Sequence, residues 1–258
     1  MKKIFAASFF IFSVLLSLSA QVSVKDSSIS TPIFGLSYGY QIAAGDMVKR
    51  FGNSSSIQLN ADYKTKKNWI LGINGSYFFG TKIKESLFDS ITVAGGNIID
   101  QNGEFSDIRL YERGFTVSLT AGRLFAFKKP NPNSGILFNV GLGFIQHKIR
   151  IETIGNAVPQ LSTEYKKGYD RLTNGLLLSE DFGYLYLGNN RYSNFYFGFQ
   201  FLQGFTRNRR SWDYEEGMKL DPTKPGLFPI YRLDLLYGCR IAWLLPIYKK
   251  PPQDFYYY

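Results

Sequence analysis

Residues that could carry out chemistry are few in this chain and lie far apart in the sequence. Among its 258 residues there is one histidine, His147, and one cysteine, Cys239. A zinc site takes three or four clustered histidine, cysteine or carboxylate ligands, so this pair does not predict one. The glycines follow an alternating pattern and do not form a phosphate-binding loop. The sequence therefore predicts no metal, no cofactor and no intrachain disulfide.

His147 is the only histidine available as a catalytic base. Enzymes built on membrane barrels, such as lipid A deacylases, palmitoyltransferases and omptin proteases, use a histidine to activate a serine or a water. Here Lys148 and Ile149 follow the histidine, and the serine that the deacylase motif places there is missing. We interpret His147 as a rim residue near the outer end of a strand and expect no enzymatic activity. A lipid A-modifying enzyme remains the third of three functional hypotheses.

Positive charge is the second chemical feature. The formal net charge is +10 at pH 7. Eight cations fall in predicted connections: Lys82, Lys84, Lys166, Lys167, Arg171, Arg207, Arg209 and Arg210. The run from Arg207 to Arg210 would suggest nucleic acid in a cytosolic protein, but the export signal described next argues against that partner. We expect these cations to meet outer-membrane lipids and the phosphates of glycolipid, or to be simply solvated.

The amino-terminal end has the features of an export signal. Lys2 and Lys3 precede an apolar run over 4–18 and small residues at 19–20, which is typical of a secretory signal peptide. The run is shorter than the ~20 residues of a spanning helix. We predict a signal peptide over 1–20, a periplasmic segment over 21–32, a barrel over 33–248 and a periplasmic tail over 249–258.

Eight segments alternate between apolar and polar residues, as strands with two different faces do. In the last of them, Tyr231 to Leu245, large apolar side chains occupy the odd positions, while charged and small residues dominate the even ones. The predicted strands are about 33–42, 56–64, 69–79, 108–125, 136–151, 176–187, 195–204 and 231–245. This is the pattern of an all-β, eight-stranded antiparallel transmembrane barrel, with a soluble β-sandwich as the alternative.

The connections alternate between long and short along the chain. Transmembrane barrels have short periplasmic turns and longer outer loops, so we expect both termini to be periplasmic and the protein to lie in the outer membrane. Six aromatic residues at the short-turn ends of strands are expected to form an interfacial girdle: Tyr63, Trp69, Phe125, Tyr186, Phe195 and Trp243. The long connections also carry apolar residues, including Leu87, Ile98 and Trp212, which would fold over the barrel mouth or bind a protein.

The inward face of these strands is polar. An eight-stranded barrel is just wide enough for side chains to fill, and a buried charge is stable only when it is paired. Four inward residues are therefore expected to pair inside: Asp62, Asp234, Arg232 and Arg240. The sixth strand is irregular, because either Glu180 or Asp181 must face lipid unless a bulge shifts the register.

Taken together, these features resemble the small outer-membrane barrel families, of OmpX- or OmpW-like architecture. The richness in Tyr, Phe, Asn and Lys is similar to that of the Bacteroidota barrels, including those of PorT and PorG type linked to type IX secretion. The resemblance implies a non-enzymatic structural or accessory subunit of the cell envelope, with protein partners in a secretion complex. A small passive channel or lipophile conduit is the second hypothesis.

The carboxyl-terminal end follows two prolines that stop the last strand. It closes with four aromatic residues, Phe255, Tyr256, Tyr257 and Tyr258. We interpret them either as a tail that binds a periplasmic or membrane partner or as a segment resting on the base of the barrel.

Overall fold

The structure is a computed structural model that describes residues 27–93, 97–127, 130–188, 192–214, 217–219 and 231–248. The predicted signal peptide and the aromatic tail, with Phe255, Tyr256, Tyr257 and Tyr258, lie outside the described residues.

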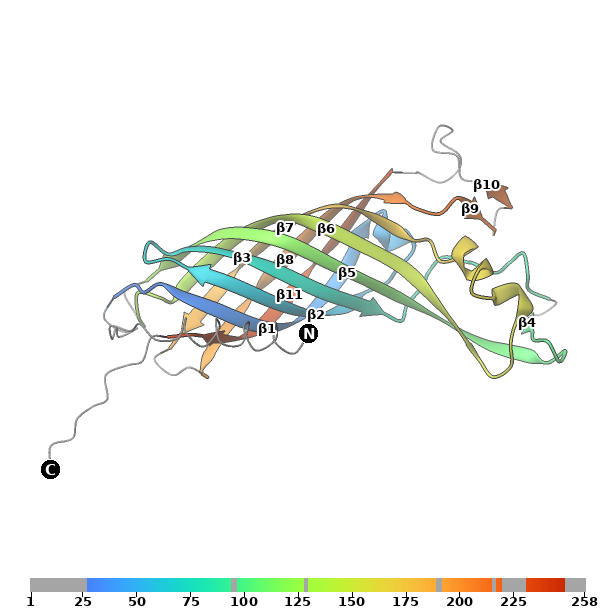
Figure 1. The fold of residues 1–258 in the computed structure, drawn as a ribbon, viewed down its shortest axis with the longest axis horizontal. Helices are drawn as coiled ribbons and strands as arrows, with labels where there is room; N and C mark the ends of the chain where they lie inside the picture. Colours follow the sequence, from blue (N-terminus) through green and yellow to red (C-terminus); the bar gives the residue numbers. More distant parts are fainter. Residues whose placement is uncertain are drawn as a thin grey trace, which may run out of the picture.

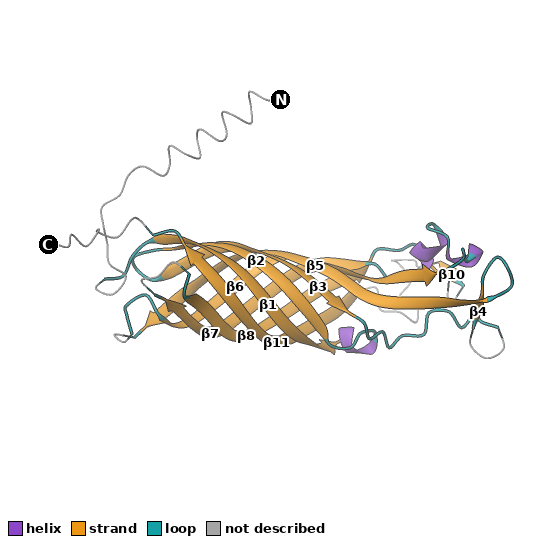
Figure 2. Cartoon of the chain, turned by 90° about the horizontal axis from the view of Figure 1, so that it is seen from below, coloured by secondary structure: helices purple, strands orange, loops and turns teal. Residues whose placement is uncertain are grey.

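Eight long strands close into one barrel (Figures 1 and 2). They are β1 (Thr31–Gly45), β2 (Ser54–Lys64), β3 (Trp69–Gly80), β5 (Phe105–Ala126), β6 (Gly135–Ile154), β7 (Thr173–Leu187), β8 (Asn194–Asn208) and β11 (Tyr231–Pro246). Each pairs with its two neighbours antiparallel, β11 pairs back onto β1, and β3 pairs with β5. The predicted eight-stranded antiparallel barrel is confirmed.

The two faces of the barrel differ as the alternation predicts. Burial switches residue by residue along the strands, so that one set of side chains points outward and the next points inward. The outward set is predominantly apolar: Leu59, Leu119, Leu142 and Leu176 are between 64 and 72% exposed. An apolar surface of this extent is stable in lipid and not in water. The six residues of the expected short-turn girdle all lie on this exposed face.

Within the described residues, no helix is long and apolar enough to cross a bilayer.

Most strands run one to three residues beyond their predicted ends, and β5 and β6 extend furthest beyond the barrel. They contain 22 and 20 residues, and their pairing continues to Asp107 opposite Ile154, well past the point where β6 leaves β7 at His147. The two strands form a two-stranded ribbon that projects from the barrel at the long-loop end, opposite the short turn that joins them (Figure 1).

The connection between β1 and β2 turns into the barrel and not away from it. It contains a short helix, η1 (Met47–Lys49), and Met47 and Phe51 on this connection are completely buried. The sequence pattern predicts this segment as one of the long outer connections. The apolar side chains at positions 47 and 51 explain the difference, because they fill the mouth of the barrel together with Phe78 and Leu236.

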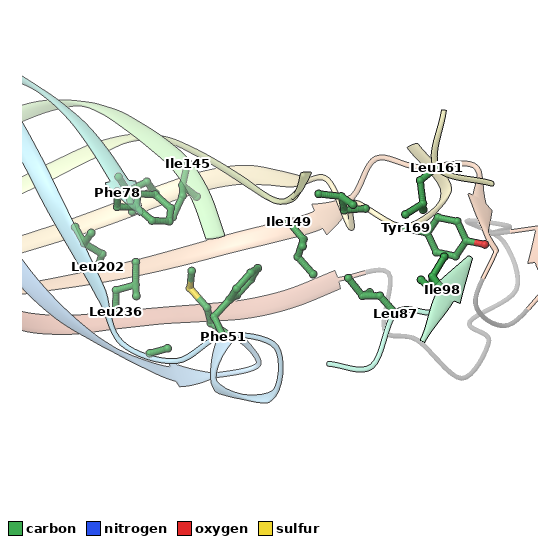
Figure 3. Packing of buried hydrophobic residues seen from close by; sticks show 14 of the residues in the cluster. Phe51, Phe78, Leu87, Ile98, Ile145, Ile149, Leu161, Tyr169, Leu202 and Leu236 are labelled. Carbon is green, nitrogen blue, oxygen red and sulfur yellow. The ribbon is translucent and has the colours of Figure 1, made fainter. Parts of the chain in front are cut away.

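The three remaining long connections fold into a compact unit, which we call the head: residues 81–104, 155–172 and 209–219 as far as described. It contains β4 (Ile98–Ile99), η2 (Pro159–Leu161), η3 (Tyr165–Gly168), β9 (Trp212–Asp213) and β10 (Met218–Lys219). Leu87, Ile98, Leu161 and Tyr169 form its interior, and this cluster continues without a break into the barrel mouth (Figure 3). The apolar loop residues thus cover the barrel, although Trp212 stays exposed.

Candidate functional site

The barrel interior is arranged in three layers along its axis. At the short-turn end nine buried apolar residues fill the lumen: Ile33, Ile70, Leu124, Leu137, Leu185, Leu187, Tyr196, Ala242 and Leu244. A polar layer follows. At the long-loop end Phe51, Phe78, Ile145, Leu202 and Leu236 form a second apolar layer (Figure 3). Polar groups in the middle are therefore shielded from both sides.

The polar middle layer is built around two glutamines that face each other across the lumen. Gln58 on β2 donates to Gln200 on β8 at 2.8 Å, and Gln200 donates back at 3.3 Å. Gln41 also donates to Gln200 at 3.3 Å. Arg240 on β11 reaches this layer, where its guanidinium lies 3.4 Å from the Asp181 carboxylate and 3.4 Å from the Gln58 side-chain oxygen. The layer thus ties together strands that are distant in sequence.

Asp62 lies in the same half of the barrel, beside a chamber of about 30 Å³ that Arg240 and Asn139 also line. Its carboxylate accepts a hydrogen bond from Asn60. The residue opposite it on β3 is Gly72, and a Cβ at that position would overlap the Asp62 carboxylate at 1.9 Å. Glycine at position 72 is therefore what leaves space for this inward charge.

Asp234 forms a second charged centre near the long-loop end. Its carboxylate accepts from Arg50 at 2.7 Å, from His147 Nε2 at 2.9 Å and from Thr206 at 2.5 Å. The side chains of Asp234 and His147 are completely inaccessible and that of Arg50 is 6% exposed. A charge so buried is stable only with such a set of partners.

The four residues expected to pair therefore occupy two levels. Asp234 and Arg232 lie in the upper charged centre, which is the one near the long-loop end. There the guanidinium groups of Arg232 and Arg50 both lie 3.5 Å from the Thr173 hydroxyl. Asp62 and Arg240 lie in the lower one. Arg50 and Asp181 also belong to the network, although the sequence pattern did not predict them as members. Arg50 carries no strand signal, and Asp181 was one of two candidates for the inward position.

His147 is not a rim residue. It is 1% exposed and its ring packs edge-on against Phe51, with the ring centroids 5.5 Å apart. The expectation was wrong because the β1–β2 connection covers this level of the barrel. His147 Nε2 and the Thr206 hydroxyl both bind Oδ2 of Asp234, so each bonds to the carboxylate through this oxygen.

An acidic residue lies on the lipid-facing side of β7. Pairing with β6 and β8 is continuous there, with no bulge, and it turns Asp181 inward and Glu180 outward. Glu180 stands opposite Val140 and Phe201. The next outward position on β8 is Gln203, opposite Leu178. Polar groups at membrane depth are expensive and mark functional contacts, so this pair, Glu180 and Gln203, is the second candidate site.

One buried arginine, Arg171, joins the three connections that make up the head. Arg171 binds Glu85 at 2.8 Å and also pairs with Asp213, so it connects all three head connections. Burial disfavours the charged guanidinium, but Asp213 and Glu85 more than offset that effect, and the pKa of Arg171 is raised. Arg210 binds Asp170 in the same way. These two of the eight predicted cations serve the structure of the head and are not available to lipid.

Comparisons with known proteins give limited information. No protein-family model matches the chain. No characterised protein matches its sequence. Among solved structures, OprG from Pseudomonas aeruginosa is 11% identical with a TM-score of 0.38, and the similarity covers 87% of this chain and 99% of that one.

Two further solved structures show a similar likeness. Ail of Yersinia pestis, in complex with the heparin analogue sucrose octasulfate, is 12% identical with a TM-score of 0.35, covering 84% of this chain and 99% of that one. The N-terminal β-barrel domain of Pseudomonas aeruginosa OprF is 10% identical with a TM-score of 0.36, covering 83% and 97%. Likenesses this weak carry no argument about function.

Proposed function

We propose that the protein is a non-conducting barrel of the outer membrane that acts as a structural or accessory subunit of the cell envelope. The observation that carries this proposal is the closed interior. An apolar layer lies at each end of the lumen, and two chambers between them have volumes of about 30 and 10 Å³, room for no more than a few water molecules. A passive channel or a lipophile conduit needs a continuous path, and the residues that the structure describes, which do not include 220–230, form none.

The first prediction concerns conductance. Full-length protein reconstituted into a planar bilayer is expected to leave the membrane electrically silent, because ions would have to cross two apolar layers. Single-channel recording over a range of voltages measures this directly. A well-characterised large porin inserted under the same conditions serves as the control. Reproducible unit conductance steps from the purified protein would contradict the proposal.

The lipid-facing pair of Glu180 and Gln203 supports an accessory role. Among the described residues neither side chain has a hydrogen bond, and both are surrounded by apolar neighbours. A carboxylate at this depth is better accommodated when another protein supplies a cation or a donor than when it faces acyl chains. We therefore place a membrane-embedded protein partner against β7 and β8.

The second prediction follows from that placement. Replacing Glu180 with leucine should stabilise the isolated barrel in lipid vesicles by about 1–2 kcal/mol, since an acidic group on the lipid face is destabilising. Urea unfolding followed by tryptophan fluorescence measures the change. Phe182→Leu, on the same face of the same strand, is the matched control and should change the unfolding free energy little.

The same variant tests the partner. A photoreactive residue at Phe201, beside Glu180, should cross-link to a protein in native membranes, and the cross-link should disappear in the Glu180→Leu background. A probe at Leu59 on β2, on the other side of the barrel, should label lipid only. Equal protein cross-linking at both positions, or cross-linking that Glu180→Leu leaves unchanged, would argue against a partner at β7 and β8.

The proposed envelope role also includes an orientation of the barrel in the membrane. In this proposal the short turns and both termini are periplasmic and the head lies outside the cell. The aromatic residues Phe255, Tyr256, Tyr257 and Tyr258 would then be available to a periplasmic partner. A PorT- or PorG-like place in a type IX secretion complex is the specific form of the proposal, supported by the resemblance in composition and by the polar pair on β7 and β8.

A further inference from the structure

A cationic cleft lies on the outward face of the β5–β6 hairpin, just above the lipid-facing belt. It has a volume of about 380 Å³ and is lined by the side chains of Tyr77, Arg113, Phe115, Gln146, Lys148 and Arg150. Phe115 on β5 stands opposite Gln146 on β6, Arg113 opposite Lys148, and Tyr111 opposite Arg150. Arg113 on β5 and Lys148 and Arg150 on β6 therefore lie close together on the outward face of the two strands.

Two of these cations face each other directly across the strand pair. Arg113 and Lys148 are antiparallel partners, and side chains in such positions start ~5 Å apart. Like charges at this separation repel each other and destabilise the sheet. An anion between the two side chains would relieve this repulsion, and would draw the Arg113 guanidinium away from the Gly80 carbonyl on the β3 side.

Among the described residues no carboxylate lies within ion-pair distance of Arg113 or Lys148, although the buried Glu112 carboxylate interacts with Arg113 at longer range. The Arg113 guanidinium donates to two backbone carbonyls, those of Glu112 at 2.7 Å and Gly80 at 3.5 Å, and lies over the Tyr111 ring. No hydrogen bond or ion pair to the Lys148 amine occurs among the described residues, and the side chain is exposed. Arg150 alone has an acidic partner, Glu152, at 2.6 Å.

The residues of the lower wall of the cleft show where the cleft lies relative to the membrane. Tyr77 and Phe115, partners across β3 and β5, are 47 and 39% exposed and begin the apolar outer face. Aromatic residues of this kind lie at the boundary between acyl chains and headgroups. The cations stand one and two outward positions above them. A group bound by Arg113 and Lys148 therefore lies at the level of the lipid headgroups.

We propose that this cleft binds the phosphate of a membrane lipid headgroup, with Arg113 and Lys148 holding the phosphate oxygens, Arg150 adding charge and Tyr77 and Phe115 packing on the first carbons of the lipid. Arginine offers a planar pair of donors to phosphate, and lysine a compact charge. The sequence-based expectation placed lipid phosphates on the loops. The structure assigns them instead to the outward faces of two strands. The inference rests on the membrane placement proposed above.

The direct test measures lipid binding to the full chain in detergent micelles by native mass spectrometry. Diphosphoryl lipid A is the probe, and the wild-type protein should retain one molecule. The Arg113→Ala/Lys148→Ala double variant should retain it at least about tenfold more weakly, because two charge-assisted contacts are lost. Arg207→Ala removes an outward cation at the same end of the barrel but outside the cleft, and should bind within twofold of wild type.

Two further probes separate the sources of the phosphate. Lipid A lacking both phosphates should bind as weakly to the wild type as diphosphoryl lipid A does to the double variant. Inorganic phosphate at millimolar concentration should displace the probe only slightly. If inorganic phosphate binds as tightly as the lipid, or if the double variant keeps its affinity within twofold, the cleft is not a lipid site.

Thermal stability gives a readout that a merely structural role would not produce. Without anionic lipid, Lys148→Ala should raise the melting temperature by about 1–3 °C, because it removes a like-charge contact. With diphosphoryl lipid A present, the same substitution should lower it relative to wild type. A change of the same sign in both conditions would overturn the proposal. These outcomes are independent of the conductance test, so the cleft and the closed-barrel function fail separately.

Discussion

Replacing Asp234 with alanine is expected to destabilise the barrel by about 3–5 kcal/mol, the largest effect of any single interior substitution. Asp234 is the common acceptor for Arg50, His147 and Thr206, and its side chain is completely inaccessible. Without it, the Arg50 guanidinium, itself 6% exposed, remains inside the barrel mouth with no ion-pair partner among the described residues, since Glu112 interacts with it only at longer range. The desolvation of that charge, and not the loss of one hydrogen bond, accounts for most of the expected change.

Urea unfolding in lipid vesicles, followed by tryptophan fluorescence, measures this prediction. Lys167→Ala is the control, because it breaks an ion pair with Glu164 of similar length, 2.7 Å, in which the side chains are 52 and 78% exposed. Exposed pairs contribute about 0–1 kcal/mol. The contrast between the two variants isolates the effect of burial.

A second variant separates the charge from the packing. Asp234→Leu combined with Arg50→Met replaces the ion pair by apolar groups in a region already lined by Phe51, Phe78 and Leu236. Such replacements are often neutral or stabilising, so the double variant should recover most of the loss seen with Asp234→Ala. An Asp234→Ala protein within about 1 kcal/mol of wild type would show that Arg50 leaves the barrel freely, and the upper charged centre would then lack structural importance.

The barrel could be predicted from the sequence because the alternation that marks each strand is a local pattern. Each strand shows a period of two over many residues, and one face of β11 reads apolar from Tyr231 to Leu245 without interruption. Register, strand order and closure follow from that alternation, the even strand number and the short turns. The ends of the strands were less predictable. Thr31 belongs to β1 because its backbone pairs with Lys64 at the end of β2, and its hydroxyl also binds the Ile247 carbonyl.

The contacts of the interior and of the head were harder to predict, because they join residues that lie far apart in the sequence. Asp234 and His147 are 87 residues apart and meet only when the barrel closes. The inward turn of Met47 and Phe51 and the packing of Leu87 against Tyr169 depend on several connections at once and show no periodicity. Alternation alone could not decide between Glu180 and Asp181, because either choice places an acid in a costly position. Pairing across three strands settled it.

Replacing Arg171 with alanine is expected to open the head while the barrel stays folded. Arg171 belongs to the connection between β6 and β7, Glu85 to that between β3 and β5, and Asp213 to that between β8 and β11. The arginine side chain is 3% exposed and that of Asp213 is 2% exposed. Removing it leaves two carboxylates in a poorly solvated position, which should destabilise the head by about 3–5 kcal/mol.

The barrel should not follow, because its strands are held by continuous pairing that does not involve Arg171. Hydrogen exchange in lipid nanodiscs distinguishes the two parts. Amides of 158–170 should exchange at least about a hundredfold faster in Arg171→Ala, following the free energy of local opening, while those of β7 and β8 keep their wild-type protection. Arg109→Ala is the control, since its pair with Asp107 is more than half exposed on both sides and measures 3.1 Å.

The backbone at this residue provides an internal check on the explanation. Arg171 has a φ of 51°, in the left-handed region, where a side chain costs about 1 kcal/mol relative to glycine. Arg171→Gly should therefore open the head about 1 kcal/mol less than Arg171→Ala, although both lack the guanidinium. Arg171→Lys should fall between alanine and wild type, because lysine keeps the charge but cannot reach two carboxylates with a planar fork. If alanine, glycine and lysine all left exchange in the head at the wild-type rate, the apolar cluster around Leu87 and Tyr169 alone would hold the three connections together.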